Sequence, residues 1–469
     1  MVLQISTTKN QIKQKNYIFE VIFKEFLGLN YHINTKTEGD FLLSSTINKN
    51  SINLPDCFFR NSESNWLHVN TSPQLPLNSF NVRSLPFPCT ITEQTIPVIY
   101  GSLLNSKKTQ KDRFHIPIDI FGSCFFMLTR YEELINSERD SHDRFASKSS
   151  LAFKEGFIDR PIVDEYVEIM WSCINWLWPN IRRKEKKIQL NVTCDVDHPW
   201  VSKPSWKNIT KSFLYNIYTR KTTKFTLRDL SNKYKFRKGN VSFDKHMAKI
   251  DWMMDVNEKQ NNTVSFYFAG GGKSKLDPKY SLDNPLIKNL IQRINERGHE
   301  IGLHPSYETY KNKNKTLQES LKLRGILKEL NITQKVYGGR QHYLRWESPT
   351  TAYNWSHSGM AYDSSLGFAD HCGFRCGTSQ TFPMFDPKLL INLNIKQKPL
   401  IVMDCTAIEQ KYMGLGITIE CNDYIQMLKK RALTIGREFT LLWHNSYFEN
   451  SFVDKMYLQL INRTNYKNL

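Results

Sequence analysis

Two aspartates near the middle of the chain carry the clearest chemical signal in the sequence. They lie in residues 193–198 (Thr-Cys-Asp-Val-Asp-His), which follow an alternating apolar run typical of a strand. Side chains two residues apart in a strand point to the same face, so Asp195 and Asp197 lie close together. Like charges this close repel unless a cation offsets them. The pair therefore predicts a bound metal ion with one carboxylate left as a base, and an acidic strand-to-loop turn is the simpler alternative.

Five further strand candidates lead into residues that bind metals or transfer protons. Six strand ends of this kind in one chain are difficult to attribute to chance, although each residue alone could be structural. In parallel α/β folds the strand ends share one face, and reactive groups gather there. The additional residues are His304, Arg340, His342, Asp363, Asp404 and His444.

The elements that must position these residues alternate between strand and helix. Strands are predicted at 188–194, 263–268, 300–304, 335–338, 361–363, 399–404 and 439–443, and helices at 244–260, 284–297, 316–330, 349–358 and 422–435. Asp283 or Asn284, followed by Pro285, is a good helix start, and Gly298 ends that helix. This order predicts an α/β fold, a distorted (β/α) barrel of about seven parallel strands. An open doubly wound sheet is the alternative, but no Gly-rich phosphate loop supports it.

Residues 1–182 read as a separate, smaller α+β domain, and the barrel domain covers 185–469. The first domain contains a helical pattern over 119–128 that extends toward Leu134, and another over 161–178. Charged residues of 130–133 are interpreted as solvated helix ends, with a salt bridge to a domain interface as the alternative.

A basic insert at about 201–240 interrupts the first βα unit. Between Lys203 and Lys238 it holds eleven Lys or Arg residues against one acidic residue, interleaved with aromatic residues. Such a segment can contact an anionic membrane surface peripherally. A solvated, partly packed insertion is the interpretation that we favour.

Composition narrows the classes of function. The 469 residues include 64 Lys and Arg against 45 Asp and Glu, a formal charge of +19, but no nucleic-acid-binding signature accompanies it, so no nucleic-acid partner is expected. The polar first 15 residues do not resemble a secretory signal, and no apolar run is long enough to span a bilayer. Nine scattered cysteines fit reduced thiols. These features predict a cytoplasmic protein, while the oligomeric state stays open.

Five motifs in order resemble those of the polysaccharide deacetylase (NodB-homology, carbohydrate esterase) family. The likeness covers about 185–450, and it leaves the N-terminal domain without an activity. The motifs are Thr-Cys-Asp-Val-Asp at 193–197, Gly-His-Glu-Ile-Gly-Leu-His at 298–304, Gly-Arg-Gln-His-Tyr at 339–343, Tyr-Asp-Ser-Ser-Leu-Gly at 362–367 and Leu-Leu-Trp-His at 441–444.

The resemblance implies metal-dependent hydrolysis of N- or O-acetyl groups on a carbohydrate. By match to the family motifs, Asp195 would be the general base and Asp197 a metal ligand. His444 would protonate the leaving group, and Arg340 would orient the base carboxylate. The implied cofactor is a divalent metal, with Zn²⁺ the first expectation, and the implied partner is a carbohydrate substrate.

The sequence departs from the family at the second motif. The family places two metal-binding histidines four residues apart, and here the first is His304 but the second position is Glu308. The spacing suits one face of a helical turn, so Glu308 is the predicted third ligand. His198 and His342 are other candidates. His299 lies at the opposite end of the strand, roughly 16 Å from His304 by strand rise, too far to share an ion.

The leading hypothesis is thus a metal-dependent carbohydrate deacetylase. The missing histidine motivates an alternative, a catalytically inactive glycan-binding or scaffold protein that retains the deacetylase barrel. Hydrolysis of a non-acetyl amide is a third hypothesis, because the same metal-bound water chemistry serves other C–N bonds.

Overall fold

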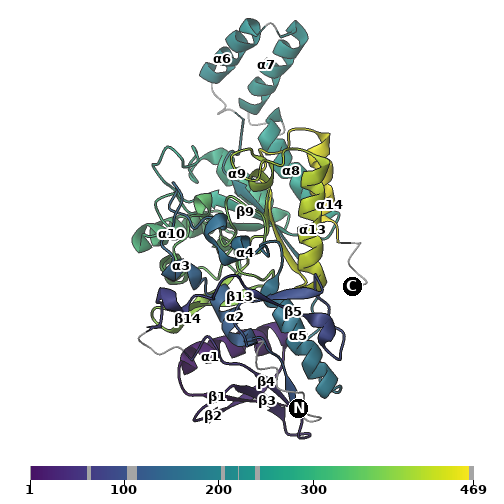
Figure 1. The fold of residues 1–469 in the computed structure, drawn as a ribbon. Coiled ribbons are helices and arrows are strands. Elements are labelled where there is room, and N and C mark those ends of the chain that lie inside the picture. The colour runs from purple at the N-terminus through teal and green to yellow at the C-terminus, as the bar shows by residue number, and fades with distance from the viewer. Residues whose placement is uncertain are drawn as a thin grey trace.

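The chain folds around two large sheets, one in each half of the computed structural model (Figure 1). The structure describes residues 2–60, 65–102, 113–201, 206–219, 221–237 and 243–463. The smaller, mixed sheet belongs to the N-terminal domain, and the larger, mostly parallel sheet belongs to the rest of the chain. The mixed α/β class and the separate smaller first domain agree with the prediction.

The N-terminal domain packs its helices on a five-stranded sheet of order β2-β1-β3-β4-β7. Residues of β1 alternate between buried and half-buried, as expected for a strand with one face on a core. Every residue of α2 is buried, so this helix forms the centre of the domain. The strands are β1 (Leu3–Thr8), β2 (Tyr31–Lys36), β3 (Phe41–Ser45), β4 (Ser51–Leu54) and β7 (Arg113–His115), with a separate pair β5 (Asn78–Asn81) and β6 (Thr95–Val98). The helices are α1 (Ile12–Phe19), α2 (Ile120–Leu128), α3 (Glu132–Ile135), α4 (Leu151–Lys154) and α5 (Ile162–Leu177).

The large sheet has nine strands in the order β13-β14-β12-β11-β10-β9-β8-β16-β15. All neighbours are parallel except β13, which is antiparallel to β14. Each of the seven predicted strands has a counterpart, whereas β13 and β14 were not predicted. The strands are β8 (Gln189–Val196), β9 (Val264–Ala269), β10 (Glu300–His304), β11 (Gly338–Gly339), β12 (Tyr362–Asp363), β13 (Phe382–Asp386), β14 (Ile391–Gln397), β15 (Val402–Met403) and β16 (Glu438–Leu442).

Strand pairing does not by itself close this sheet into the expected barrel. β13 and β15 stand at the two ends of the strand order and do not pair with each other. However, β14 and β15 are successive pieces of one segment, joined by residues 398–401. The N–H of Lys398 donates to the carbonyl oxygen of Asp363 in β12, and the N–H of Ile401 donates to the carbonyl oxygen of Thr440 in β16. One extended segment therefore contacts both sides of the sheet.

Helices cover the large sheet where the sequence predicted them. Their starts follow local chemistry, since Asp244 caps α8 and Asn284 caps α9 with Pro285 in the first turn. The predicted helices correspond to α8 (Lys245–Glu258), α9 (Pro285–Glu296), α10 (Lys313–Glu329), α11 (Thr350–His357) and α13 (Ile419–Ile435), and the structure adds α12 (Asp404–Ile408) and α14 (Ser451–Ile461).

The basic insert folds into two helices, α6 (Trp206–Tyr218) and α7 (Thr223–Arg237), which project as a hairpin beyond α8 and α9 (Figure 1). The limits of the insert, Lys203 and Lys238, lie outside the described residues. We call 206–237 the helical hairpin.

The charged residues at 130–133 are buried, so the interpretation as solvated helix ends is wrong. Arg130 has a left-handed backbone, φ 53°, which separates α2 from α3. Glu133 receives two bonds of 2.9 Å from the guanidinium of Arg375 in the second half of the chain, and a third of 2.7 Å from Arg130. Burying these charges is tolerated because they neutralise one another across the junction of the two domains.

Within the described ranges, we find no helix with the length and apolar character that a membrane-spanning segment requires.

Candidate active site

The candidate site forms where the parallel strands β8, β10, β11 and β16 end. Asp195 is the second-last residue of β8, and Asp197 is the first residue after this strand. His304 is the last residue of β10. Arg340 follows β11, and His444 lies two residues after β16. Parallel pairing brings these ends to one edge of the sheet, with Leu303 opposite Gly339 and Thr193 opposite Leu442. Residues far apart in sequence thus line one pocket of about 250 Å³.

Asp197, His304 and His342 form a group suited to a metal ion. Their ligand atoms all lie within 4.8 Å of one another. The Oδ1 of Asp197 is 3.4 Å from Nε2 of His304 and 3.9 Å from Nε2 of His342. This Oδ1 is buried, yet it has no hydrogen-bond partner among the described residues. A buried carboxylate oxygen without a partner that faces two imidazoles is a suitable position for a cation, and one carboxylate with two histidines suits Zn²⁺.

Hydrogen bonding on the far side of His304 prepares it as a ligand. Its Nδ1 lies 2.7 Å from the carbonyl oxygen of Arg340, which accepts only from an N–H, so the proton is on Nδ1. The Nε2 lone pair is then free to face Asp197. Burial opposes the charged form of His304, but the Asp195 and Asp197 carboxylates outweigh it and raise its pKa in the metal-free state. Burial would raise the pKa of Asp197, but the neighbouring His304, His342 and His444 hold it well below its usual range.

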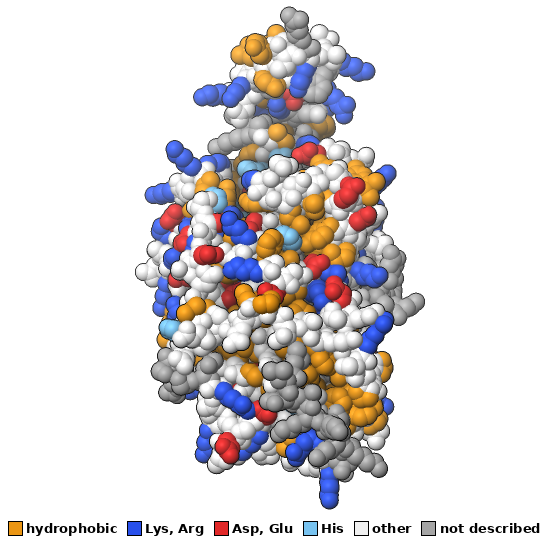
Figure 2. Space-filling view, viewed as in Figure 1, with side chains coloured by type: hydrophobic (Ala, Val, Ile, Leu, Met, Phe, Trp, Pro, Cys, Tyr) orange, Lys and Arg blue, Asp and Glu red, His pale blue; other side chains and the backbone are white. Residues whose placement is uncertain are grey.

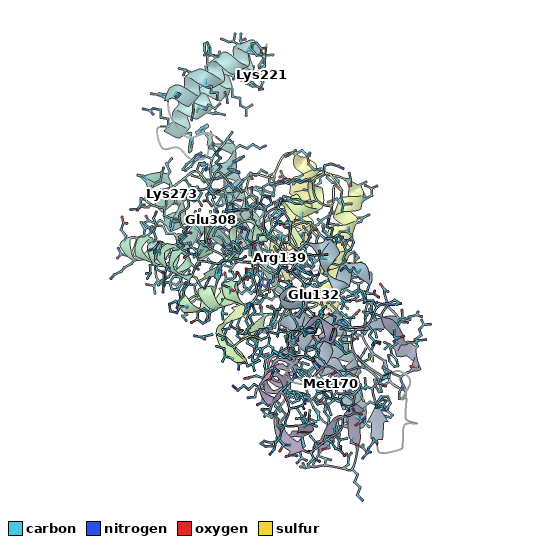
Figure 3. The ribbon with its side chains drawn as sticks, turned by 60° about the vertical axis from the view of Figure 1, so that its left-hand side comes forward. Glu132, Arg139, Met170, Lys221, Lys273 and Glu308 are labelled. Atoms are coloured by element: carbon cyan, nitrogen blue, oxygen red, sulfur yellow. The ribbon has the colours of Figure 1, made fainter. Side chains whose placement is uncertain are left out.

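The structure does not bring Glu308 to this group, which instead contains His342, one of the other candidates. Residues 305–309 form a turn rather than the helical turn expected from the spacing. The N–H of Ser306 donates to Glu319 and that of Tyr307 donates to Asp277, so the chain turns away from the pocket. Glu308, labelled in Figure 3, is consequently exposed.

His198 lines the pocket but is not part of the metal group. Its side chain is exposed, and its carbonyl oxygen accepts bonds from Asn445 and His246. His299 lies at the start of β10, where its Nδ1 bonds to the N–H of Val264. This position agrees with the distance argument that excluded His299.

Asp195 is buried and held by a single guanidinium. Its Oδ1 accepts a bond of 2.8 Å from Nη1 of Arg340, which is itself fully buried. Arg340 also donates to Oγ1 of Thr193 and to both oxygens of Ser364. These bonds fix the guanidinium and offset the buried charge of Asp195. The second oxygen, Oδ2, lies 3.7 Å from Nδ1 of His304.

His444 is oriented by Asp404, to which the sequence assigned no role. The Nδ1 of His444 lies 2.7 Å from Oδ1 of Asp404, and the N–H of His444 donates to the other oxygen. Burial would lower the pKa of His444, but the Asp404 carboxylate outweighs it and raises the pKa to about 9. His444 is therefore protonated at neutral pH. Its Nε2 lies 3.8 Å from Oδ2 of Asp197, so it presents a proton beside the metal group.

The N-terminal domain holds the loop that carries His342. The next residue, Tyr343, has a left-handed backbone with φ 60°, a strained conformation that neighbouring contacts must maintain. Nη1 of Arg144 donates to the carbonyl oxygen of Tyr343 at 3.1 Å. On the other side, Nε of Arg345 donates to the carbonyl oxygen of His142 at 2.8 Å. We call these two bonds the domain clamp.

Arg144 of the N-terminal domain also forms part of the wall of the pocket. Its guanidinium pairs with Asp140 at 2.7 Å. The side chains of Tyr343, Tyr412 and Tyr447 also line the pocket and form its aromatic wall. The first domain is therefore part of the candidate site, and no linear motif could have indicated this.

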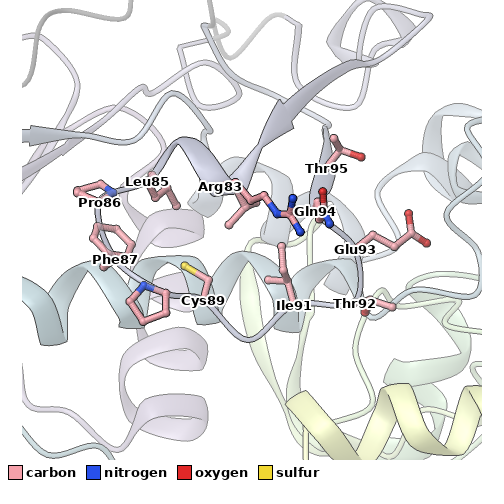
Figure 4. Close-up of a pocket in the computed structure, with 12 residues that line it drawn as sticks. Arg83, Leu85, Pro86, Phe87, Cys89, Ile91, Thr92, Glu93, Gln94 and Thr95 are labelled. Atoms are coloured by element: carbon pink, nitrogen blue, oxygen red, sulfur yellow. The ribbon is translucent and has the colours of Figure 1, made fainter.

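A second hollow lies in the N-terminal domain, lined by residues 82–95 (Figure 4). Its volume is about 1130 Å³, but none of its lining residues is a histidine. Glu93 at its rim is occupied in ion pairs with Arg160 and Arg431. It offers no group comparable to the one beside Asp197.

Comparisons with known proteins give one family match, in the N-terminal domain, and a distant structural likeness. Residues 3–179 match the model of a "family of unknown function (DUF7033)". Comparison with curated proteins gives no match. A solved structure described as "putative polysaccharide deacetylase from Mycobacterium smegmatis" shares 13% identity at a TM-score of 0.39, over 59% of this chain and 84% of that one. At this level, the likeness supports neither a fold nor an activity for this chain.

Proposed function

We propose that the chain is a metal-dependent hydrolase that removes N- or O-acetyl groups from a carbohydrate. One observation carries this proposal. A group of one carboxylate and two histidines adjoins a carboxylate held by arginine and a histidine held by aspartate, all in one pocket. A general base, a general acid and a set of metal ligands are the groups that metal-dependent hydrolysis of an amide or ester uses.

Asp197, His304 and His342 would hold the divalent ion, Zn²⁺ in the first instance. When bound, the ion supplies Lewis acidity at the acetyl carbonyl and makes a coordinated water more acidic. Asp195 accepts the proton of the attacking water, and the hydrogen bond from Arg340 holds the Asp195 carboxylate in position. His444 donates the proton at its Nε2 to the departing nitrogen or oxygen of the sugar. The aromatic wall gives a sugar ring apolar contact.

The proposal extends to the shape of the sheet. We infer that residues 391–403, through β14 and β15, close the large sheet into a distorted barrel. The bonds of Lys398 to Asp363 and of Ile401 to Thr440 support this, because they connect the two ends of the parallel strand order.

Acetate release tests the function directly. Purified protein loaded with Zn²⁺, Co²⁺ or Mn²⁺ should release acetate from at least one member of a panel of N- and O-acetylated sugars. Asp195→Asn should lower the rate by about 10³-fold, since it removes the base. Glu308→Gln, which changes an exposed carboxylate in the turn after β10, is the control and should leave the rate unchanged.

Two results would overturn the proposal. Saturable sugar binding without turnover, unaffected by Asp195→Asn, would favour the glycan-binding alternative. Turnover of formamides or cyclic amides alone would favour hydrolysis of a non-acetyl amide.

A further inference from the structure

The helical hairpin is rooted at the mouth of the candidate site. His198 lines the pocket, and only residues 199–205 separate it from α6. The two stems of the hairpin are tied together at this point, because the N–H of Val201 donates to the carboxylate of Asp244 at 3.0 Å. Nδ1 of His246 also lies 3.0 Å from the carbonyl oxygen of His198. The two chain segments that flank the hairpin therefore lie together beside the pocket.

The hairpin exposes large apolar side chains instead of burying them. Leu214 is 65% exposed, Tyr218 86% and Leu227 67%. Phe213, Leu214, Ile217 and Tyr218 lie at the i, i+1, i+4 and i+5 positions that form one stripe along a helix. Contiguous exposed apolar groups of this kind mark an interaction surface rather than ordinary solvent exposure.

Positive charge surrounds this stripe. The described part of the hairpin contains eight Lys or Arg residues and one acidic residue, Asp229, which pairs with Lys233. Figure 2 shows basic and apolar side chains near one another on the visible face of the projecting end of the molecule. An apolar stripe flanked by cations fits the interface of an anionic bilayer, with aliphatic groups between lipid headgroups and ammonium groups at phosphates. Leu214, Ile217 and Leu227 have no comparable use against a nucleic acid, which takes aromatic rings and cations.

We propose that the helical hairpin docks on an anionic membrane surface and brings the pocket to it. If the proposed function holds, a pocket brought to a membrane surface acts on an acetylated sugar that is attached to a lipid anchor. The substrate class thus rests on the proposed function. The docking itself needs neither the metal nor turnover, so the two parts can be tested apart.

Vesicle co-sedimentation of the full chain tests docking. Phosphatidylcholine vesicles containing about 30% phosphatidylglycerol should bind the protein, whereas pure phosphatidylcholine should bind it at least about tenfold less. Leu214→Ser combined with Ile217→Ser and Leu227→Ser should reduce binding to anionic vesicles by about tenfold or more. Leu321→Ser, an exposed leucine on α10, is the matched control and should bind like the parent. Equal binding by the triple variant, or no binding to anionic vesicles, would overturn the proposal, and so would preference for a labelled oligonucleotide over vesicles.

Activity measurements then distinguish the substrate class from the function. The triple variant should hydrolyse a water-soluble acetylated sugar at the parental rate, but a vesicle-borne acetylated glycolipid at least about tenfold more slowly. Equal rates on the glycolipid would overturn the lipid-linked substrate. Docking by both the parent and Asp195→Asn, without acetate release from any substrate, would refute the proposed function and leave the docking surface standing.

Discussion

At the residue scale, the site depends on one orphaned oxygen and its neighbours. Oδ1 of Asp197 is buried and has no hydrogen-bond partner in the part of the chain that the structure describes, and His304 and His342 both face it. A protein fold tolerates such an arrangement when a cation completes it. The proposed ligand set therefore contains His342, from the loop after β11, and not Glu308.

His342→Ala should weaken Zn²⁺ affinity by about 100-fold or more, because it removes one of three ligands. Glu308→Ala should leave the affinity unchanged, since this side chain is exposed. Competition with a chromogenic chelator measures both values without relying on activity. The reverse ranking of the two variants would restore Glu308 as the ligand.

Asp404→Asn should lower acetate release by about 100-fold while the bound metal stays stoichiometric. Asp404 orients His444 and raises its pKa, so its loss removes the proton donor rather than the metal. Elemental analysis beside the rate measurement separates the two effects. A parallel loss of metal would show instead that Asp404 belongs to the metal site.

At the element scale, a loop of one domain is held by a segment of the other. The domain clamp joins Arg144 to the carbonyl oxygen of Tyr343 and Arg345 to that of His142. Tyr343 has a left-handed backbone, a conformation that the loop would not maintain without these bonds. We therefore assign a positioning role to the N-terminal domain.

Arg144→Ala should reduce Zn²⁺ affinity about tenfold, because His342 loses its fixed position. Arg83→Ala, an exposed arginine of the same domain, is the control and should have no effect. Chelator competition again provides the measurement, with thermal melting to verify folding. Unchanged affinity in a folded Arg144→Ala protein would contradict the positioning role.

At the scale of the whole molecule, a buried ion cluster couples the two domains. Burial would raise the pKa of Glu133, but Arg375 and Arg130 outweigh it and lower the pKa to about 2. A carboxyl with a depressed pKa in the folded state adds stability above its unfolded pKa, near 4.5. That stability is lost as the pH falls from about 4.5 toward 2.

Acid unfolding should show this coupling. Between pH 5 and pH 2 the free energy of unfolding should fall by about 3 kcal/mol through Glu133 alone. Glu133→Gln should show a shallower pH dependence and a lower stability at pH 7, whereas Glu296→Gln, exposed on α9, should match the parent. Urea denaturation at several pH values measures both. An unchanged pH slope in Glu133→Gln would show that the ion cluster does not depress the pKa of Glu133 in the folded protein.

Local pattern was sufficient to predict most of the elements. Strand candidates such as 300–304 and helix candidates such as 284–297 are close to β10 and α9, because periodicity and caps are properties of neighbouring residues. β13 and β14 were missed. β14 alternates apolar with polar residues, which is the period of a half-buried strand, so its own pattern carried a signal for it. Its pairing with β12, in contrast, links residues about 30 positions apart and is not visible in any local pattern.

The sequence by itself determined that Asp195 and Asp197 end a strand, and that His304, Arg340 and His444 follow other strands of the same kind. Those facts depend on short-range pattern. Only the tertiary structure decided that His342 faces Asp197 and that Asp404 holds His444. It also decided that Arg144 supports the loop that carries His342. These contacts join segments 40 to about 200 residues apart. Their geometry depends on how parallel strands and two domains pack, which no spacing along the chain records.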